Sequence, residues 1–222
     1  MVQEQKRLNI RLPLYTLGEE IFHAISHGIG AALSVVALAL MVAKARGPLA
    51  QISVSFFGTT MILLYTVSCV YHSLSRRLEG KKVMRVIDHC DIYFLIAGTY
   101  TPILLCAIRP LNPALAWSIF GVEWALTAIA VTLNAIDLKR FEKISMVCYI
   151  GMGWCVIAVL KLTIDAMTMP GFLLLLAGGI AYTIGAVLYG IGKKVRYMHS
   201  VFHVLVLAGS VLQFLAILLY VM

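Results

Sequence analysis

Long apolar stretches separated by short polar connections make up most of the chain. A helix needs about 20 apolar residues to cross the roughly 30 Å hydrocarbon core of a bilayer. Breaks at Gly, Pro and clusters of charge divide the sequence into seven runs of this kind. The runs are Ile21 to Ala43, Ser53 to Ser73, Val86 to Ala107, Ala114 to Leu133, Ile144 to Thr163, Gly171 to Ile191 and Ser200 to Met222. The pattern predicts an all-α, polytopic membrane protein built as a bundle of seven transmembrane helices.

The domain organisation follows from the connections between these runs. Residues 1–20 are predicted to form a polar N-terminal tail and residues 21–222 a single transmembrane domain. The connections are too short to hold a separate soluble domain. No small-residue cleavage pattern follows a short apolar stretch, so no removable signal peptide is predicted.

The composition agrees with a membrane protein and excludes an ordinary cytosolic globule. Hydrophobic residues make up 61% of the chain and charged residues 13%, whereas a soluble domain has roughly a quarter charged residues. The five cysteines lie in or beside apolar runs without paired spacing. They therefore predict no disulfide framework.

The distribution of cations predicts how the chain is oriented in the membrane. The formal net charge is +8, but the cations lie in short connections rather than in a basic domain, so nucleic acid is not an expected partner. The tail and every second connection carry most of them: Lys6, Arg7, Arg11; Arg76, Arg77, Lys81, Lys82, Arg85; Lys139, Arg140, Lys143; Lys193, Lys194 and Arg196. The alternate connections hold Lys44, Arg46 and Arg109. Because Lys and Arg mark the cytoplasmic side, the N-terminus is predicted inside and the C-terminus outside.

This topology places several polar side chains at one depth, just within the cytoplasmic boundary. The second run ends at His72, the third begins near Asp88, and the seventh begins near His199 and His203. Residues four apart share a helix face, so His199 and His203 can face one ion, and Ser68 and His72 can face a common neighbour. Ionisable groups inside a membrane are costly and usually functional.

Three imidazoles from two helices form a plausible zinc site with an open fourth position, which is typical of catalytic zinc. In this interpretation Asp88 is a carboxylate that acts through water. Two alternatives stay open. The residues could form only an interhelical hydrogen-bond cluster, or they could bind a metal that merely ties the helices together.

The start of the first run carries further polar residues. Thr16 and Glu19 have the spacing of a capping box, and the helix dipole favours Glu20. His23 and His27 are four residues apart, so they could shape the mouth of the site or form a rival metal pair. Glu123, near the middle of the fourth run, must find a donor or be protonated, and it could be a packing partner or a functional group.

Several motifs together resemble the hemolysin III branch, which is the bacterial branch of the progestin and adiponectin Q receptor family. They are the segment from Glu19 to Gly28, the Ser68 and His72 pair, the segment from Asp88 to Pro102, and the His199 and His203 pair. The resemblance spans nearly the whole chain. It implies seven helices with the N-terminus inside, a bacterial cell-membrane location, and zinc held by His72, His199 and His203. It further implies that Asp88 contacts the zinc through water and that Ser68 supports the site.

The functional hypothesis is a zinc-dependent hydrolase of lipid amide or ester bonds, similar to a ceramidase. Asp88 and Ser68 are its candidate catalytic residues, Zn²⁺ its cofactor, and membrane lipids its partners. The alternative is a non-enzymatic sensor or regulator of membrane homeostasis with structural zinc. A pore-forming hemolysin and a proton-coupled transporter are further alternatives. The sequence does not set the oligomeric state.

Overall fold

The computed structural model describes residue 10 and residues 12–192 and 195–222, and these residues form helices without any strand. The elements are α1 (Leu17–Lys44), α2 (Pro48–Ser73), α3 (Glu79–Pro102), the π-helix η1 (Ile103–Ile108), α4 (Pro113–Asp137), α5 (Glu142–Gly153), the 3₁₀ helix η2 (Cys155–Val159), α6 (Leu160–Gly192) and α7 (Met198–Tyr220). The prediction of an all-α protein is confirmed.

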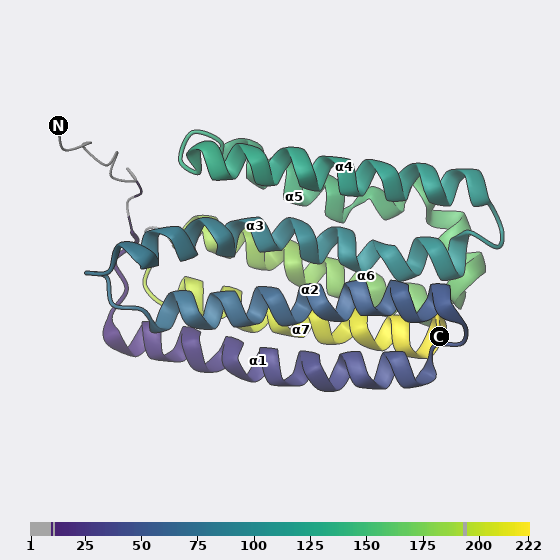
Figure 1. Ribbon diagram of the computed structural model, residues 1–222, viewed down its shortest axis with the longest axis horizontal. Coiled ribbons are helices and arrows are strands. Elements are labelled where there is room, and N and C mark those ends of the chain that lie inside the picture. The colour runs from purple at the N-terminus through teal and green to yellow at the C-terminus, as the bar shows by residue number, and fades with distance from the viewer. Residues whose placement is uncertain (1–9, 11, 193–194) are drawn as a thin grey trace.

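The long helices lie side by side in an elongated bundle (Figure 1). α1 packs against both α2 and α7, α2 packs against α3, and α6 packs against α7, so the first and last helices are neighbours. α1 and α7 begin at the same end of the bundle and run in the same direction. This shared end also holds the end of α2 and the start of α3.

Six helical stretches among the described residues are long and apolar enough to cross a membrane. Four of them contain the predicted runs one to four, and a fifth, Met198–Tyr220, contains all but the last two residues of the seventh run. The sixth is the 51-residue stretch Glu142–Gly192, which contains both the predicted fifth and sixth runs. Within it, Thr168 has a φ of 62° and a ψ of 166°, which interrupts α6 between two helical parts. A positive φ is strained for a β-branched residue, so Thr168 marks a real change of direction between the two runs.

Two predictions about helix ends can be compared with the structure. α1 begins at Leu17, four residues before the predicted start of the first run, and Thr16 and Glu19 form the predicted capping box. α3 ends at Pro102 and continues as the π-helix η1. Proline has no amide hydrogen and cannot continue the regular hydrogen-bond pattern, which explains the change in helix type.

The outer surface of the bundle carries apolar side chains and its interior holds some polar ones, as expected for a protein surrounded by lipid. Val36 on α1 and Val187 on α6 are 55% and 57% exposed, whereas Tyr65 is buried. The Tyr65 hydroxyl donates to Ser210 Oγ at 2.6 Å, and the Tyr182 hydroxyl lies 2.7 Å from the same oxygen. These contacts join α2, α6 and α7 in the middle of the bundle.

Candidate metal centre

Four buried histidines from three helices meet at the end of the bundle where α1 and α7 begin. His23 comes from α1, His72 from α2, and His199 and His203 from α7. One ring nitrogen of each lies within 4.8 Å of one from every other member. The structure thus brings together the three histidines predicted as ligands and adds His23. We call these four residues the histidine cluster.

The α7 pair already has a spacing suited to a metal. His199 Nε2 and His203 Nε2 lie 3.1 Å apart, because residues four apart stack on one face of a helix. Two imidazole nitrogens bound at about 2.0–2.1 Å to a tetrahedral zinc ion are about 3.3 Å apart. The pair can therefore approach one ion with little movement of the helix.

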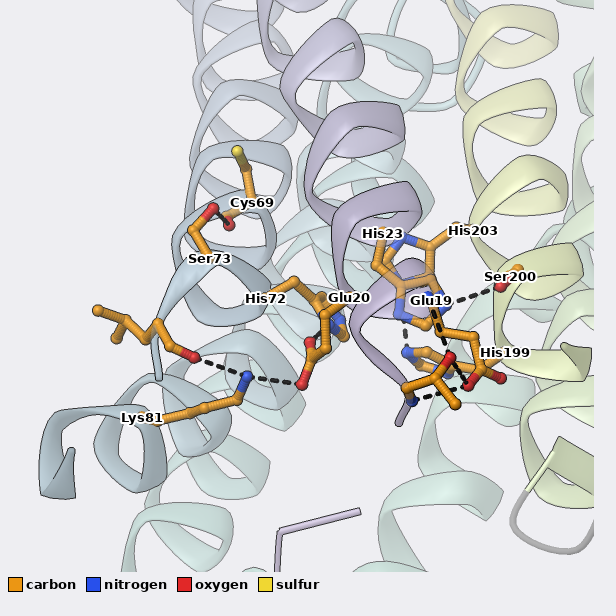
Figure 2. A network of polar contacts seen from close by, with 12 residues as sticks. Glu19, Glu20, His23, Cys69, His72, Ser73, Lys81, His199, Ser200 and His203 are labelled. Atoms are coloured by element: carbon orange, nitrogen blue, oxygen red, sulfur yellow. Dashed lines mark hydrogen bonds and ion pairs between the residues drawn. The ribbon is translucent and has the colours of Figure 1, made fainter. Parts of the chain in front are cut away.

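His72 is held by a charged partner on the side away from the cluster. Its Nδ1 lies 2.7 Å from Glu20 Oε2, and Glu20 Oε1 accepts a hydrogen bond from Lys81 Nζ at 2.7 Å. Figure 2 shows Glu20 between His72 and Lys81. An Nδ1–H that donates to Glu20 leaves the lone pair on Nε2, the orientation that carboxylates impose on metal-binding histidines.

His23 has a similar arrangement with a neutral partner. Its Nε2 lies 2.9 Å from the hydroxyl oxygen of Ser200, which is in the first turn of α7. The His23 ring lies between the other members, with its centroid 4.5 Å from that of His203 and 4.6 Å from that of His72. Figure 2 shows His23, His199 and His203 gathered beside Ser200.

The donor set fits a metal ion. Buried polar atoms normally have a hydrogen-bond partner. Yet His23 Nδ1 and His72 Nε2 have none among the described residues, and neither ring nitrogen of neighbouring His27 has one. Clustered imidazole nitrogens with free lone pairs are the ligands that zinc and several other transition metals prefer, so the cluster is suited to hold a metal.

Tyr15 covers the cluster from the segment before α1. Its ring stacks on His199 at a centroid distance of 4.9 Å and meets His23 edge-on at 5.1 Å. Burial raises the pKa of the Tyr15 hydroxyl well above its usual value, so the phenol stays protonated. Sequence reasoning gave no signal for Tyr15, which lies in the predicted tail.

An internal cavity of about 170 Å³ adjoins the histidine cluster. Its polar wall includes the predicted catalytic residues Ser68 and Asp88, together with His199 and His203. The rest is mainly apolar and extends along α7 as far as Gln213, about 21 Å from His199 at 1.5 Å per residue. The cavity therefore runs along α7 from the histidine cluster, with a largely apolar wall and scattered polar side chains.

The other polar residues of α1 have different roles: Glu19 is structural, whereas His27 lies in the cavity wall. Glu19 caps α1 and also accepts a hydrogen bond from the Tyr197 amide at 3.1 Å, so it joins the starts of α1 and α7. His27 lines the cavity and stacks on His203 at a centroid distance of 3.8 Å. His23 and His27 were expected to form a possible second metal pair, but only His23 belongs to the histidine cluster.

Asp88 and Glu123 are not members of the histidine cluster. Asp88 lines the cavity, and its Oδ2 lies 3.7 Å from His89 Nδ1. Glu123 is buried in α4. The depth argument that selected His199 also applies to His23, since both begin a helix at the same end of the bundle, and it could have found this fourth histidine.

Comparison with known proteins places this arrangement in a family. Residues 15–214 match the family described as Haemolysin-III related. The chain belongs to that family. The matched region contains the whole histidine cluster, Ser68 and Asp88, so the site lies within the part that defines the family.

Individual relatives agree with this assignment. Hemolysin-3 of Bacillus cereus is 39% identical over 207 residues, which cover 92% of each chain. The Hemolysin-3 homolog of Bacillus subtilis (strain 168) is 37% identical over 210 residues, covering 93% of this chain and 96% of the relative. Together with the apolar helices, these relatives identify a multi-pass bacterial membrane protein of the haemolysin III type.

Proposed function

We propose that this protein is a zinc-dependent hydrolase that cleaves amide or ester bonds of membrane lipids. The observation that carries the proposal is that His199 and His203 belong both to the histidine cluster and to the wall of the apolar cavity. A lipid chain in this cavity would present its polar end to the metal-binding nitrogens.

The residues around the cavity have complementary roles in this proposal. Zinc bound by the cluster would supply Lewis acidity, lowering the pKa of a water molecule and polarising the scissile carbonyl. Asp88 accepts the proton that the attacking water loses and returns it to the leaving amine or alcohol. Ser68 orients the carbonyl by donating a hydrogen bond.

Seven membrane spans are part of the same proposal. Two helical parts separated at Thr168 divide the stretch Glu142–Gly192, and we propose that each part crosses the membrane once. The shared direction of α1 and α7 supports an odd number of spans (Figure 1). With the N-terminus inside, the histidine cluster lies at the cytoplasmic side. The cations Lys6, Arg7, Arg11, Lys193 and Lys194, which contribute to this orientation, lie outside the described residues.

The test compares metal content and lipid hydrolysis in the purified protein and two variants. Asp88→Asn should retain one zinc per chain and lose at least about 100-fold in hydrolysis, since a positioned acid–base group contributes 10²–10⁴-fold. Asp165→Asn is the matched control because Asp165 is exposed and does not line the cavity. Hydrolysis by Asp88→Asn at the rate of the unmodified protein would refute the catalytic role.

A second candidate function is a regulator of membrane homeostasis in which zinc is structural. The presence of four histidines in the cluster favours it, because structural zinc sites are usually closed by four protein ligands. Chelation then lowers the thermal unfolding temperature while no lipid product is formed before or after metal removal. A zinc-dependent lipid product would decide for the hydrolase instead.

A further inference from the structure

The environment of His23 differs from that of an ordinary packed histidine. The ring is fully buried, and only one of its nitrogens has a partner: Nε2 lies 2.9 Å from Ser200 Oγ, whereas Nδ1 has none among the described residues. A histidine that serves only to pack normally satisfies both nitrogens or lies where water can reach one of them. The His23 ring instead lies among three other imidazoles, those of His72, His199 and His203.

The partner of His23 is placed as the partner of a metal ligand would be. In neutral imidazole one nitrogen donates and the other accepts. An Nε2–H that donates to Ser200 leaves the Nδ1 lone pair available, as an Nδ1–H that donates to Glu20 leaves Nε2 of His72 available. Metal-binding histidines commonly have their second nitrogen fixed in this way.

We infer that His23 is a fourth metal ligand, bound through Nδ1 and oriented by Ser200. This inference rests on the metal site of the proposed function and extends it. Four imidazoles fill the tetrahedral coordination that zinc prefers. The resting site is therefore closed, and hydrolysis requires His23 to leave or a fifth ligand to join.

The position of His23 suggests how the site opens. Unlike His199 and His203, His23 does not line the cavity. It comes from α1, whose start is tied to α7 by the contact of Glu19 with the Tyr197 amide at 3.1 Å. Breaking this contact would let the start of α1 move away from α7 and vacate the fourth position while the α7 pair stays in place. His23 would then regulate access of a water molecule or a lipid to the metal.

X-ray absorption of the zinc-loaded, full-length protein in detergent tests this inference without any substitution. Four imidazoles and no oxygen ligand are expected. Three imidazoles with one oxygen ligand would overturn the role of His23 while leaving the proposed hydrolase intact. Purified protein without stoichiometric metal would overturn both, whereas four imidazoles without lipid hydrolysis would overturn only the hydrolase.

Cobalt substitution gives a second readout. The visible spectrum of the cobalt form should not change on addition of azide, because no position is open. His23→Ala should keep one cobalt per chain, bind it at least about 10-fold more weakly, and show a saturable spectral change with azide. His89→Ala is the matched control, since His89 is a partly buried histidine at the same end of the bundle whose nitrogens contact Arg85 O at 2.8 Å and Tyr189 Oη at 3.0 Å. An azide response of the unmodified protein equal to that of His23→Ala would overturn the inference.

Discussion

Glu20 illustrates how one charged residue near the start of α1 can organise the histidine cluster. Its two carboxylate oxygens face His72 and Lys81, each at 2.7 Å. Lys81 is only 2% exposed, and a buried ammonium ion needs a charged partner. Glu20 therefore stabilises a buried cation on one side and fixes the imidazole of His72 on the other.

Replacing Glu20 tests this double role. Glu20→Gln keeps the size of the side chain and removes its charge. Only one acceptor oxygen then remains for His72 and Lys81, and both lose their charged partner. We expect zinc affinity to fall about 10–100-fold, the usual effect of removing a partner of a metal-binding histidine. Competition with a chromogenic chelator measures the change. Glu79→Gln is the control, because Glu79 forms an exposed ion pair with Lys82 at 3.0 Å. Equal affinities of the two variants would contradict the role of Glu20.

Part of the histidine cluster could be predicted from the sequence because the position of a residue along an apolar run sets its depth in the membrane. Helix ends follow from apolar runs, and residues at equal depth on different helices can meet. His72, His199 and His203 were found in this way. The contacts of His23 with Ser200 and of Glu20 with Lys81 were not, since they depend on how α1 is rotated and on which helices are its neighbours. An apolar pattern with few polar residues leaves that rotation undetermined.

At the scale of helices, close packing of α6 against α7 fixes the pair that carries His199 and His203. A Cβ atom on Gly178 would lie 3.0 Å from the carbonyl oxygen of Gly209, and a Cβ on Gly209 would lie 3.1 Å from that of Gly178. Small residues at such crossings allow two backbones to approach within the membrane. His199 and His203 therefore lie on a helix that can shift little against α6.

Gly178→Ala is expected to separate these helices. The added methyl group meets backbone that cannot rotate away, and overpacking of this kind costs about 1–3 kcal/mol. Thermal unfolding in detergent should show a lower midpoint. Gly179→Ala is a closely matched control, since a Cβ at that position has no neighbour within 4 Å and alanine favours helix by about 1 kcal/mol. A midpoint of Gly178→Ala at or above that of Gly179→Ala would show that the contact is not tight.

The helices themselves were largely predictable, but one boundary was not. Apolar runs separated by charged connections predict α1 to α4 and α7, with errors of up to seven residues at their ends, the largest being the start of α3 at Glu79 instead of Val86. The segment between Ile144 and Ile191 differs because the connection near Thr168 and Pro170 has little charge. Helix geometry therefore continues past the predicted end of the fifth run in α6, with a break set by the backbone of Thr168. Hydrophobic pattern alone cannot show whether such a stretch bends, reverses or continues.

At the scale of the whole molecule, the two ends of the bundle differ in both charge and chemistry. The end with the histidine cluster also carries Arg76 and Arg77 in the connection between α2 and α3, and Lys82 in the first turn of α3. The described connections at the other end contain Lys44, Arg46 and Arg109. The sequence alone predicts this asymmetry, since it depends only on the order of charges along the chain.

The charge asymmetry predicts that the histidine cluster faces the cytoplasm, which decides the leaflet from which a lipid could enter. Since Lys and Arg are retained on the cytoplasmic side, alkaline phosphatase fused after Met222 should be exported and active. The same enzyme fused after Ser75, in the connection between α2 and α3, should stay inside and be inactive. Green fluorescent protein at the two positions should give the opposite pattern and controls for expression. Active phosphatase at Ser75 would place the cluster on the outside, where only lipids of the outer leaflet could reach Asp88 and Ser68 through the cavity.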